Sequence, residues 1–259
     1  MKNRFAFILF NSLLFISSLV YSQGLDVEYK DDQVNLKGYF SKEKKGLKNA
    51  PGIVIIHQWM GLSQHEKDVA NKLAAIGYNA FAADIYGEGN TPKSMPEAVK
   101  QAGKYKSDYK MYQSRIQAAI DQLIALGADS NKIVVIGYCF GGTGALEAAR
   151  GELNVKGVVS FHGGLGKDTT RMDQKLSTKI LVLHGADDPF VSKMEVDRFQ
   201  KEMKNSQADW QMIYYANAVH AFTHKDAGSD NSKGAAYNQK ADERSWQHLL
   251  IFLKEVIPV

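Results

Sequence analysis

The chain has 259 residues, of which 44% are hydrophobic and 23% charged, and these proportions are ordinary for a folded protein with one sizeable core. Its 32 basic and 28 acidic residues nearly balance, which excludes the strongly basic composition of many nucleic-acid-binding proteins. The single cysteine excludes a disulfide bond within the chain.

The first residues have the pattern of a secretory signal peptide. Lys2 and Arg4 precede an apolar run over 5–20, and the residues up to Ser22 offer a tolerable cleavage site. The run is short for a membrane span and is interrupted by asparagine and serine, although an uncleaved anchor stays open as an alternative. We therefore predict a signal peptide over 1–22.

We expect the remaining chain, 23–259, to form one domain that is exported to the periplasm or the cell exterior. Without the two basic residues of the leader it has 30 basic and 28 acidic residues, a net charge of about +2. We expect a monomer with a small-molecule substrate, no nucleic-acid partner and no membrane span after signal removal. A lone thiol meets oxidants in that compartment, so we expect it to have a role.

Segments with the periodicity of strands alternate with segments of helical periodicity along this domain. The first two strands, 25–29 and 34–40, alternate apolar and polar residues and predict an antiparallel pair at the sheet edge. Continuous apolar runs predict further strands over 51–57, 78–83, 133–136, 155–161, 180–184 and 210–215.

Helix signals fall between these strands. Ser63 and Glu66 predict a capping box for a helix that ends at Gly77, and Ser192 and Glu195 repeat the capping pattern. Further helices are predicted over 91–110, as one irregular helix, and over 116–124. Another is predicted to begin directly after the single cysteine, and the last spans about 235–256. This alternation predicts an α/β fold with a mostly parallel central sheet and helices on both faces.

One strand leads into a sharp turn with the cysteine at its centre. Gly137-Tyr138-Cys139-Phe140-Gly141 has the form G-x-C-x-G, the nucleophile-elbow pattern with cysteine in place of the usual serine. The turn requires small residues two positions before and after the nucleophile. Cys139 is then exposed at the strand end, with the backbone N–H of Phe140 available to an oxyanion. The alternative is a buried structural cysteine beside a glycine-rich turn.

Polar side chains follow most of the predicted strands. In open α/β sheets the functional site lies beyond the carboxyl ends of the strands. The residues delivered there are His57, Gln58 and Trp59, then Asp84 and Tyr86, then Cys139, then His162, then His184, Asp187 and Asp188, and finally His220 and Phe222. This clustering favours a catalytic role for the cysteine.

A catalytic thiol needs a base, because near its reference pKa of about 8.5 it is mostly protonated at neutral pH. The base in turn needs a partner that holds its tautomer. In this architecture the nucleophile, the acid and the histidine follow one another along the chain, and Asp188 and His220 follow Cys139 in that order. Asp187 competes for the role of the acid, and we favour Asp188, which directly precedes Pro189.

The other histidines allow alternative roles. His57 and His162 lie at strand ends and could line a pocket or satisfy backbone groups, and His224 could touch substrate or solvent. His220 and His224 have the i, i+4 spacing of metal ligands. Because no glutamate lies between them and no third ligand is within sequence reach, we expect no metal site.

Three ordered motifs carry a resemblance to a known family. They are Gly137-Tyr138-Cys139-Phe140-Gly141-Gly142, His184-Gly185-x-x-Asp188-x-x-Val191 and His220-Ala221-Phe222. With them the chain, from about Ile53 to its end, resembles the dienelactone hydrolase family of α/β-hydrolases, which have a cysteine nucleophile. The resemblance implies a triad of Cys139, Asp188 and His220 that cleaves a carboxylic ester or lactone through an acyl-cysteine intermediate, without a cofactor.

The resemblance also implies the remaining parts of the site. By position, the backbone N–H groups of Phe140 and Trp59 would bind the oxyanion. The substrate is expected to contact the side chains of Gln58, Tyr86, His162, Phe222 and His224.

The chain departs from the family pattern at two places. Gln58 stands where the family commonly has a glutamate that interacts with the resting thiol, and an amide neither carries a charge nor accepts a proton. Dienelactone-cleaving members grip the substrate carboxylate with arginines, which are absent from 84–90 and from the four residues after His220, where His224 stands. We therefore expect a less anionic ester or lactone than a dienelactone.

Two other functions stay open. Gln58 and the missing arginines are compatible with a non-catalytic protein that kept a ligand-binding pocket. An exposed Cys139 is compatible with a redox-sensing thiol.

Overall fold

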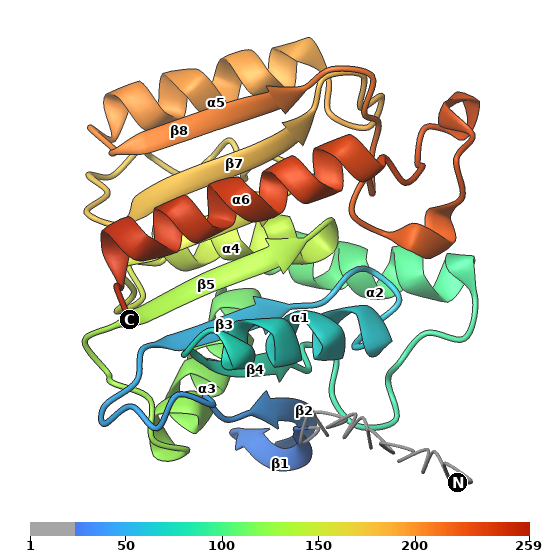
Figure 1. The fold of residues 1–259 in the computed structure, drawn as a ribbon. Helices are drawn as coiled ribbons and strands as arrows, with labels where there is room; N and C mark the ends of the chain where they lie inside the picture. The colour runs from blue at the N-terminus through green and yellow to red at the C-terminus, as the bar shows by residue number, and fades with distance from the viewer. Residues whose placement is uncertain (1–23) are drawn as a thin grey trace, which may run out of the picture.

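The structure is a computed structural model that describes residues 24–259. Eight strands form one sheet in the order β1-β2-β4-β3-β5-β6-β7-β8 (Figure 1). They are β1 (Leu25–Asp31), β2 (Val34–Ser41), β3 (Gly52–Ile56), β4 (Asn79–Ala83), β5 (Ile133–Tyr138), β6 (Gly157–Phe161), β7 (Lys179–Gly185) and β8 (Trp210–Tyr215). The β1–β2 and β2–β4 pairs are antiparallel and the other neighbouring pairs of this sheet are parallel, so the predicted α/β fold is confirmed.

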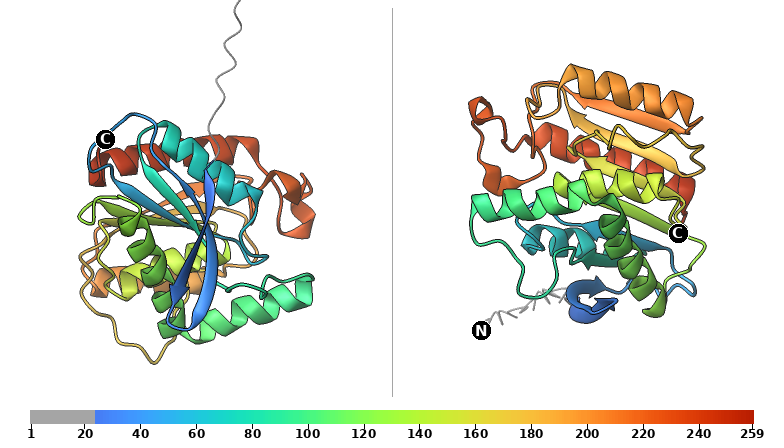
Figure 2. Two further views of the ribbon diagram at one scale, coloured as in Figure 1. Left: turned by 90° about the horizontal axis from the view of Figure 1, so that it is seen from below. Right: turned by 180° about the vertical axis from the view of Figure 1, so that it is seen from behind.

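Helices cover both faces of the sheet. They are α1 (Gln64–Ala75), α2 (Met95–Ser107), α3 (Tyr109–Ala125), α4 (Phe140–Arg150), α5 (Lys193–Asn205) and α6 (Gln239–Val256). Helices α1 and α6 pack on one face, and α3, α4 and α5 pack on the other (Figure 2). Helix α2 lies on the side of α3 and α4 and projects past the carboxyl ends of the central strands (Figure 1).

The central strands are apolar on both sides because both of their faces are buried. In β3, Val54 and Ile56 belong to the core under α3 and α4, whereas Ile53 and Ile55 belong to the core under α1 and α6. Successive side chains of a strand point to opposite faces, so one run of isoleucine and valine serves two cores. Burying each such side chain fully contributes about 1.5–3 kcal/mol. This burial fixes the register that brings the strand ends into one row.

The helix boundaries correct three predictions. Residues 91–110 do not form one irregular helix: α2 is regular, begins after its cap Ser94 and ends at Asp108. The side chain of Asp108 accepts a hydrogen bond from the backbone N–H of Met111 at 3.0 Å and so starts α3, seven residues before the predicted start. The last helix begins after Asn238 rather than at 235, because the Asn238 side chain caps it.

The two predicted capping boxes differ in outcome. At α1 the box of Ser63 and Glu66 is complete, and Gly77, with φ of +111°, follows the end of the helix. At α5 the Ser192 side chain caps the helix, but the Glu195 carboxylate turns away and accepts hydrogen bonds from two backbone N–H groups of the loop between β6 and β7. The second box is therefore half formed, because a neighbouring loop competes for the glutamate.

The predicted signal peptide, 1–22, lies outside the described residues, so export stays a prediction. Among residues 24–259 no helix has the length and hydropathy that a membrane crossing requires.

Candidate active site

The cysteine stands on a strained turn at the end of β5. Cys139 has φ of +54° and ψ of −112°, a backbone conformation that costs about 1–3 kcal/mol for a residue with a side chain. A Cβ atom on Gly137 would lie 1.9 Å from the backbone oxygen of Gly141, and one on Gly141 would lie 2.2 Å from that of Ile56. The turn therefore requires both glycines of the elbow pattern, as the sequence predicts.

The structure brings the three polar residues of the predicted triad together. The Nε2 atom of His220 lies 3.0 Å from Sγ of Cys139, and its Nδ1 atom lies 2.9 Å from Oδ2 of Asp188. The other oxygen of Asp188 accepts a hydrogen bond from the backbone N–H of Phe190 at 2.9 Å. Asp187 is exposed and its side chain takes no part in this chain of contacts, so the geometry favours Asp188 over Asp187.

The pKa values of the thiol and the imidazole shift in opposite directions. Burial alone would raise the pKa of Cys139, but the hydrogen bond and charge of His220, helped by the charge of Lys106 and the N–H of Phe140, hold it below its ordinary value. Burial alone would lower the pKa of His220, but the hydrogen bonds to Asp188 and Cys139 raise it to about 10. A proton therefore rests more favourably on the imidazole than on the sulfur, which is an ion-pair arrangement.

The loop that carries His220 is tied down at several points. The backbone N–H of His220 donates to the oxygen of Gly234 at 3.1 Å, and its own oxygen accepts from Ala236 at 3.0 Å. His162 packs behind the imidazole with a centroid distance of 5.3 Å, and its Nε2 atom lies 2.9 Å from the Thr223 hydroxyl. Burial lowers the pKa of His162, so this ring stays neutral beside His220.

A second set of contacts fixes the loop after β3. The Nδ1 atom of His57 lies 2.6 Å from the backbone oxygen of Gln58, and the N–H of Ile85 donates to Nε2 of His57 at 3.2 Å. The hydroxyl of Tyr86 donates to the backbone oxygen of Trp59 at 2.9 Å. These contacts hold the backbone at Trp59, the residue predicted to supply the second oxyanion donor.

Within residues 24–259 neither predicted oxyanion donor gives its N–H to a protein oxygen outside the helices and strands, and the N–H of Phe140 is directed to the Cys139 sulfur. The N–H of Gln58 is directed to the Glu66 carboxylate at 3.4 Å. Within residues 24–259 the N–H of Trp59 donates to no protein acceptor. Phe140 is the first residue of α4, a position whose N–H has no partner within the helix.

Three of the predicted substrate contacts lie in the interior of this structure. His162 and Phe222 have no exposed surface, and Tyr86 is almost fully buried. The side chain of His162 contacts Thr223, that of Tyr86 contacts the backbone of Trp59, and that of Phe222 packs in the core under α6. Their contact with substrate stays a prediction, and in this structure they support the site from behind.

The other two predicted contacts lie close together. The side-chain Nε2 of Gln58 lies 3.3 Å from Nδ1 of His224, so the amide is engaged with the imidazole. His224 is half-buried and borders a cavity of about 520 Å³ between α1, α6 and residues 223–226. Neither Cys139 nor His220 lines this cavity, so it lies beside the thiol and not around it. Within residues 24–259 no group of three His, Cys, Asp or Glu side chains could hold a metal ion.

Sequence reasoning missed two residues beside the triad. Lys106 ends up near the thiol because α2 projects past the strand ends, and no pattern in the sequence indicated that placement. Phe190 lies edge-on against the His220 ring at a centroid distance of 5.3 Å and is 61% exposed. Its position two residues after Asp188 in a loop is the one signal in the sequence that could have indicated it.

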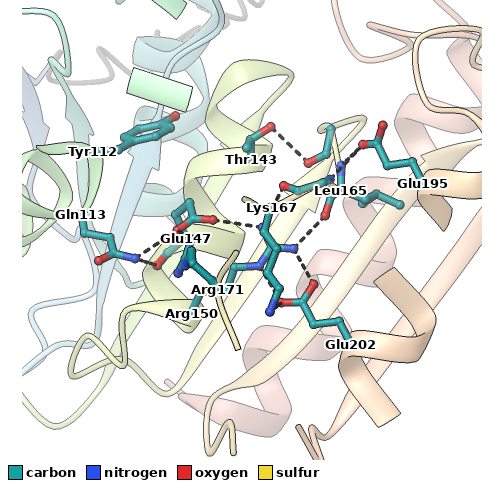
Figure 3. A network of polar contacts seen from close by, with 12 residues as sticks. Tyr112, Gln113, Thr143, Glu147, Arg150, Leu165, Lys167, Arg171, Glu195 and Glu202 are labelled. Atoms are coloured by element: carbon teal, nitrogen blue, oxygen red, sulfur yellow. Dashed lines mark hydrogen bonds and ion pairs between the residues drawn. The ribbon is translucent and has the colours of Figure 1, made fainter. Parts of the chain in front are cut away.

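A buried ionic network, here called the Arg150 network, lies at the C-terminal end of α4, opposite the end that follows Cys139. It consists of Arg150 and Glu147 on α4, Glu202 on α5 and the backbone of the β6–β7 loop (162–178), as Figure 3 shows. The side chains of Arg150, Glu147 and Glu202 are almost completely buried. Nearby, the Thr143 hydroxyl donates to the oxygen of Gly164 at 3.1 Å. The network thus ties the helix that follows Cys139 to the next loop of the sheet.

Comparison with known proteins places these features in a family. The model of the family described as dienelactone hydrolase family matches residues 36–257. The crystal structure of a dienelactone hydrolase-like promiscuous phosphotriesterase from metagenomic libraries is 34% identical, with a TM-score of 0.85 over 90% of this chain and 98% of that chain.

Two curated relatives extend the comparison. A probable 2-oxo-3-(5-oxofuran-2-ylidene)propanoate lactonase from Bradyrhizobium sp is 29% identical over 79% of this chain and 83% of its own length. A putative carboxymethylenebutenolidase from Escherichia coli strain K12 is 23% identical over 85% of this chain and 83% of its own length.

Proposed function

This chain belongs to the dienelactone hydrolase family of α/β-hydrolases, and we propose that it cleaves carboxylic esters or lactones through Cys139, His220 and Asp188 and an acyl-cysteine intermediate. One observation carries the proposal: the Sγ–Nε2 distance of 3.0 Å in a chain of contacts that ends on Asp188. A nucleophile within hydrogen-bond reach of a base that a third group orients is the arrangement that acyl transfer requires.

The acylation step follows from the ion pair. The thiolate of Cys139 attacks the carbonyl carbon, and the carbonyl electrons move to the oxygen, where the N–H groups of Phe140 and Trp59 receive the negative charge. When this intermediate collapses, the bond to the alcohol oxygen breaks and His220 gives its Nε2 proton to that oxygen. The products are a free alcohol, a thioester on Cys139 and a neutral imidazole.

The deacylation step restores the resting enzyme. The neutral His220 takes a proton from a water molecule, and the hydroxide adds to the thioester carbon. Collapse of the second intermediate expels the thiolate and releases the carboxylic acid. Asp188 keeps the Nδ1–H tautomer of His220 through both steps and stabilises the imidazolium each time it forms.

The charges around the thiol support a weakly anionic substrate. The amide of Gln58 contacts His224, so the two side chains that replace the family's charged groups lie against each other, and neither is a carboxylate or a guanidinium. The names of two relatives include a lactonase and a carboxymethylenebutenolidase, and these support lactones beside open esters as candidate substrates. Phosphotriesters join the list because the crystal structure at 34% identity is that of a phosphotriesterase.

A substrate panel tests the proposal. The panel contains short-chain p-nitrophenyl esters, unsubstituted lactones and one phosphotriester. Hydrolysis of each compound by wild-type protein covering 23–259 is measured, and the rates show which of these classes are substrates. Cys139→Ala and His220→Ala should each abolish hydrolysis while melting temperatures stay near the wild-type value. Equal rates in the three proteins would overturn the triad. Ligand-induced stabilisation without turnover of any compound would favour a binding protein instead.

A further inference from the structure

The aromatic ring of Phe190 lies against the imidazole of His220, and contacts of its backbone and of its ring fix its position. Its backbone N–H is bound to Asp188 at 2.9 Å, and its ring lies edge-on to His220 at a centroid distance of 5.3 Å. A Cβ atom on Gly234 would meet the tip of the Phe190 ring at 3.1 Å, so the glycine leaves room for the ring. Phe190 is therefore a fixed part of the site although 61% of its surface is exposed.

Two aromatic rings contact the imidazole of His220, and they differ in exposure. His162, which has no exposed surface, lies edge-on to His220 at a centroid distance of 5.3 Å. Phe190, which is largely exposed, lies edge-on at the same centroid distance. Of these two rings, Phe190 is the one that offers an accessible apolar surface to a ligand at His220.

The chemistry decides which part of the substrate lies there. In the mechanism above, His220 gives its Nε2 proton to the oxygen of the departing alcohol, so that oxygen must come within about 2.6–3.2 Å of Nε2. The carbon atoms attached to this oxygen then lie close to the imidazole and to the exposed Phe190 ring that contacts it. The carbonyl oxygen faces the N–H groups of Trp59 and Phe140, and the acyl chain leaves the carbonyl carbon in a direction different from that of the alcohol.

We propose that the exposed face of Phe190 forms an apolar subsite for the alcohol part of the substrate, and that the enzyme prefers esters of apolar alcohols or lactones with an alkyl group on the carbon that bears the ring oxygen. The proposal rests on the proposed ester hydrolysis and deepens it. A large apolar side chain that the fold holds in the open beside a reacting atom offers the surface that such a group buries.

Two series of esters separate this subsite from a general effect. In the alcohol series, ethyl, butyl and hexyl acetate have leaving groups of nearly equal basicity and differ in apolar length. In the acyl series, ethyl acetate, ethyl butyrate and ethyl hexanoate keep the alcohol constant. For the wild-type protein we expect kcat/KM to rise about fourfold from ethyl to butyl acetate, as partial burial of two methylene groups predicts.

Phe190→Ala should flatten the alcohol series to less than about a twofold rise and leave the shape of the acyl series unchanged. Phe190→Leu keeps an apolar side chain and should retain part of the alcohol preference. Met194→Ala is the matched control, because Met194 is also exposed, at 59%, and lies in the first turn of α5 away from the imidazole. It should leave both series as in the wild type.

The outcomes distinguish the two proposals. An active wild-type enzyme without any preference in the alcohol series overturns the subsite and leaves ester hydrolysis standing. A loss in Phe190→Ala that is equal for all six esters also overturns it, since it would mean that the ring only positions His220. Failure of the wild type to hydrolyse any ester or lactone would overturn the proposed function and the subsite together.

Discussion

Two clusters of buried polar side chains lie at the two ends of α4, and their side chains are paired differently. In the Arg150 network all five N–H groups of the guanidinium are used: three reach Glu202 and Glu147, and two reach backbone oxygens of the β6–β7 loop. In the triad, Asp188 and His220 are likewise saturated, but the chain of contacts ends at Cys139, which is part-exposed.

The difference indicates how hydrogen-bonded charged side chains can either stabilise the fold or take part in a reaction. Burial alone would lower the pKa of Arg150, yet Glu202 and Glu147 outweigh it and raise the pKa, so the guanidinium stays charged. Each N–H group of the guanidinium already has a partner. The triad ends instead on a part-exposed sulfur, which has room for a new bond. Breaking the network should therefore cost stability, and breaking the triad should cost activity.

The largest expected effect is on activity. Asp188→Asn should lower kcat about 10³–10⁴-fold, because the amide no longer holds the reactive tautomer of His220 or stabilises its positive charge. Asp187→Asn is the matched control, since Asp187 is exposed and its side chain does not contact the imidazole. The measurement is hydrolysis of a short-chain p-nitrophenyl ester. Equal losses in the two variants would remove Asp188 from its assigned role.

The next effect is on stability. Arg150→Met removes the guanidinium and leaves the buried Glu147 and Glu202 carboxylates with only Arg171 and Lys167 as cationic partners, which should lower the free energy of unfolding by up to about 3–5 kcal/mol. Denaturant unfolding measures this change, and kcat/KM per folded molecule should stay within about threefold of the wild type because Cys139 lies at the other end of α4. Arg198→Met, at an exposed position of α5, is the control and should change stability by less than about 0.5 kcal/mol.

Two outcomes of these stability and activity measurements would contradict the comparison between the clusters. If Arg150→Met unfolds no more easily than Arg198→Met, the network does not stabilise the fold. If it keeps its stability but loses activity, the two clusters are not separate in function.

The smallest effect concerns Gln58, at the position where the family commonly has a glutamate that interacts with the resting thiol. Gln58→Glu restores that carboxylate, and like charges disfavour the thiolate, so alkylation of Cys139 by iodoacetamide at neutral pH should slow by about threefold. Gln58→Met has a similar size without charge and should slow it less. An unchanged rate in Gln58→Glu would show that the amide, held by His224, has no influence on the sulfur.

How much of this could be predicted from the sequence depends on the kind of contact. The elbow at Cys139 could be predicted because the steric limits of a sharp turn select particular residues next to one another in the chain. Asp188 could be predicted because the nucleophile, the acid and the histidine follow a fixed order along the chain. The orientation of the side chains at and after the strand ends could not be predicted in the same way. Whether Tyr86 or Phe222 faces a ligand or the core depends on what packs against it from elsewhere in the chain, and the structure places both in the interior.

The same limit explains the helices. The break between α2 and α3 depends on Asp108 capping the second helix, whereas Glu195 gives up its expected partner for the distant β6–β7 loop. A capping residue is a local signal that the sequence contains. The sequence does not show whether a distant segment will compete for the same side chain. Phe190 belongs to the second kind, since its value comes from lying against His220.

The most direct test of the central claim is the rate of alkylation of Cys139 by iodoacetamide as a function of pH, with residual ester hydrolysis measured on the same samples. The pKa of Cys139 lies below its ordinary value and that of His220 is about 10, so the thiolate should be lost only as the pH falls through the lowered pKa of the cysteine. We predict that the alkylation rate exceeds that of a free thiol at neutral pH and that its rise with pH levels off at a lower pH than for a free thiol, with activity lost in step with one alkyl group per chain. A rate that rises about tenfold per pH unit through neutral pH, as for an ordinary thiol, would contradict the ion pair, and full activity in the alkylated protein would contradict the cysteine nucleophile.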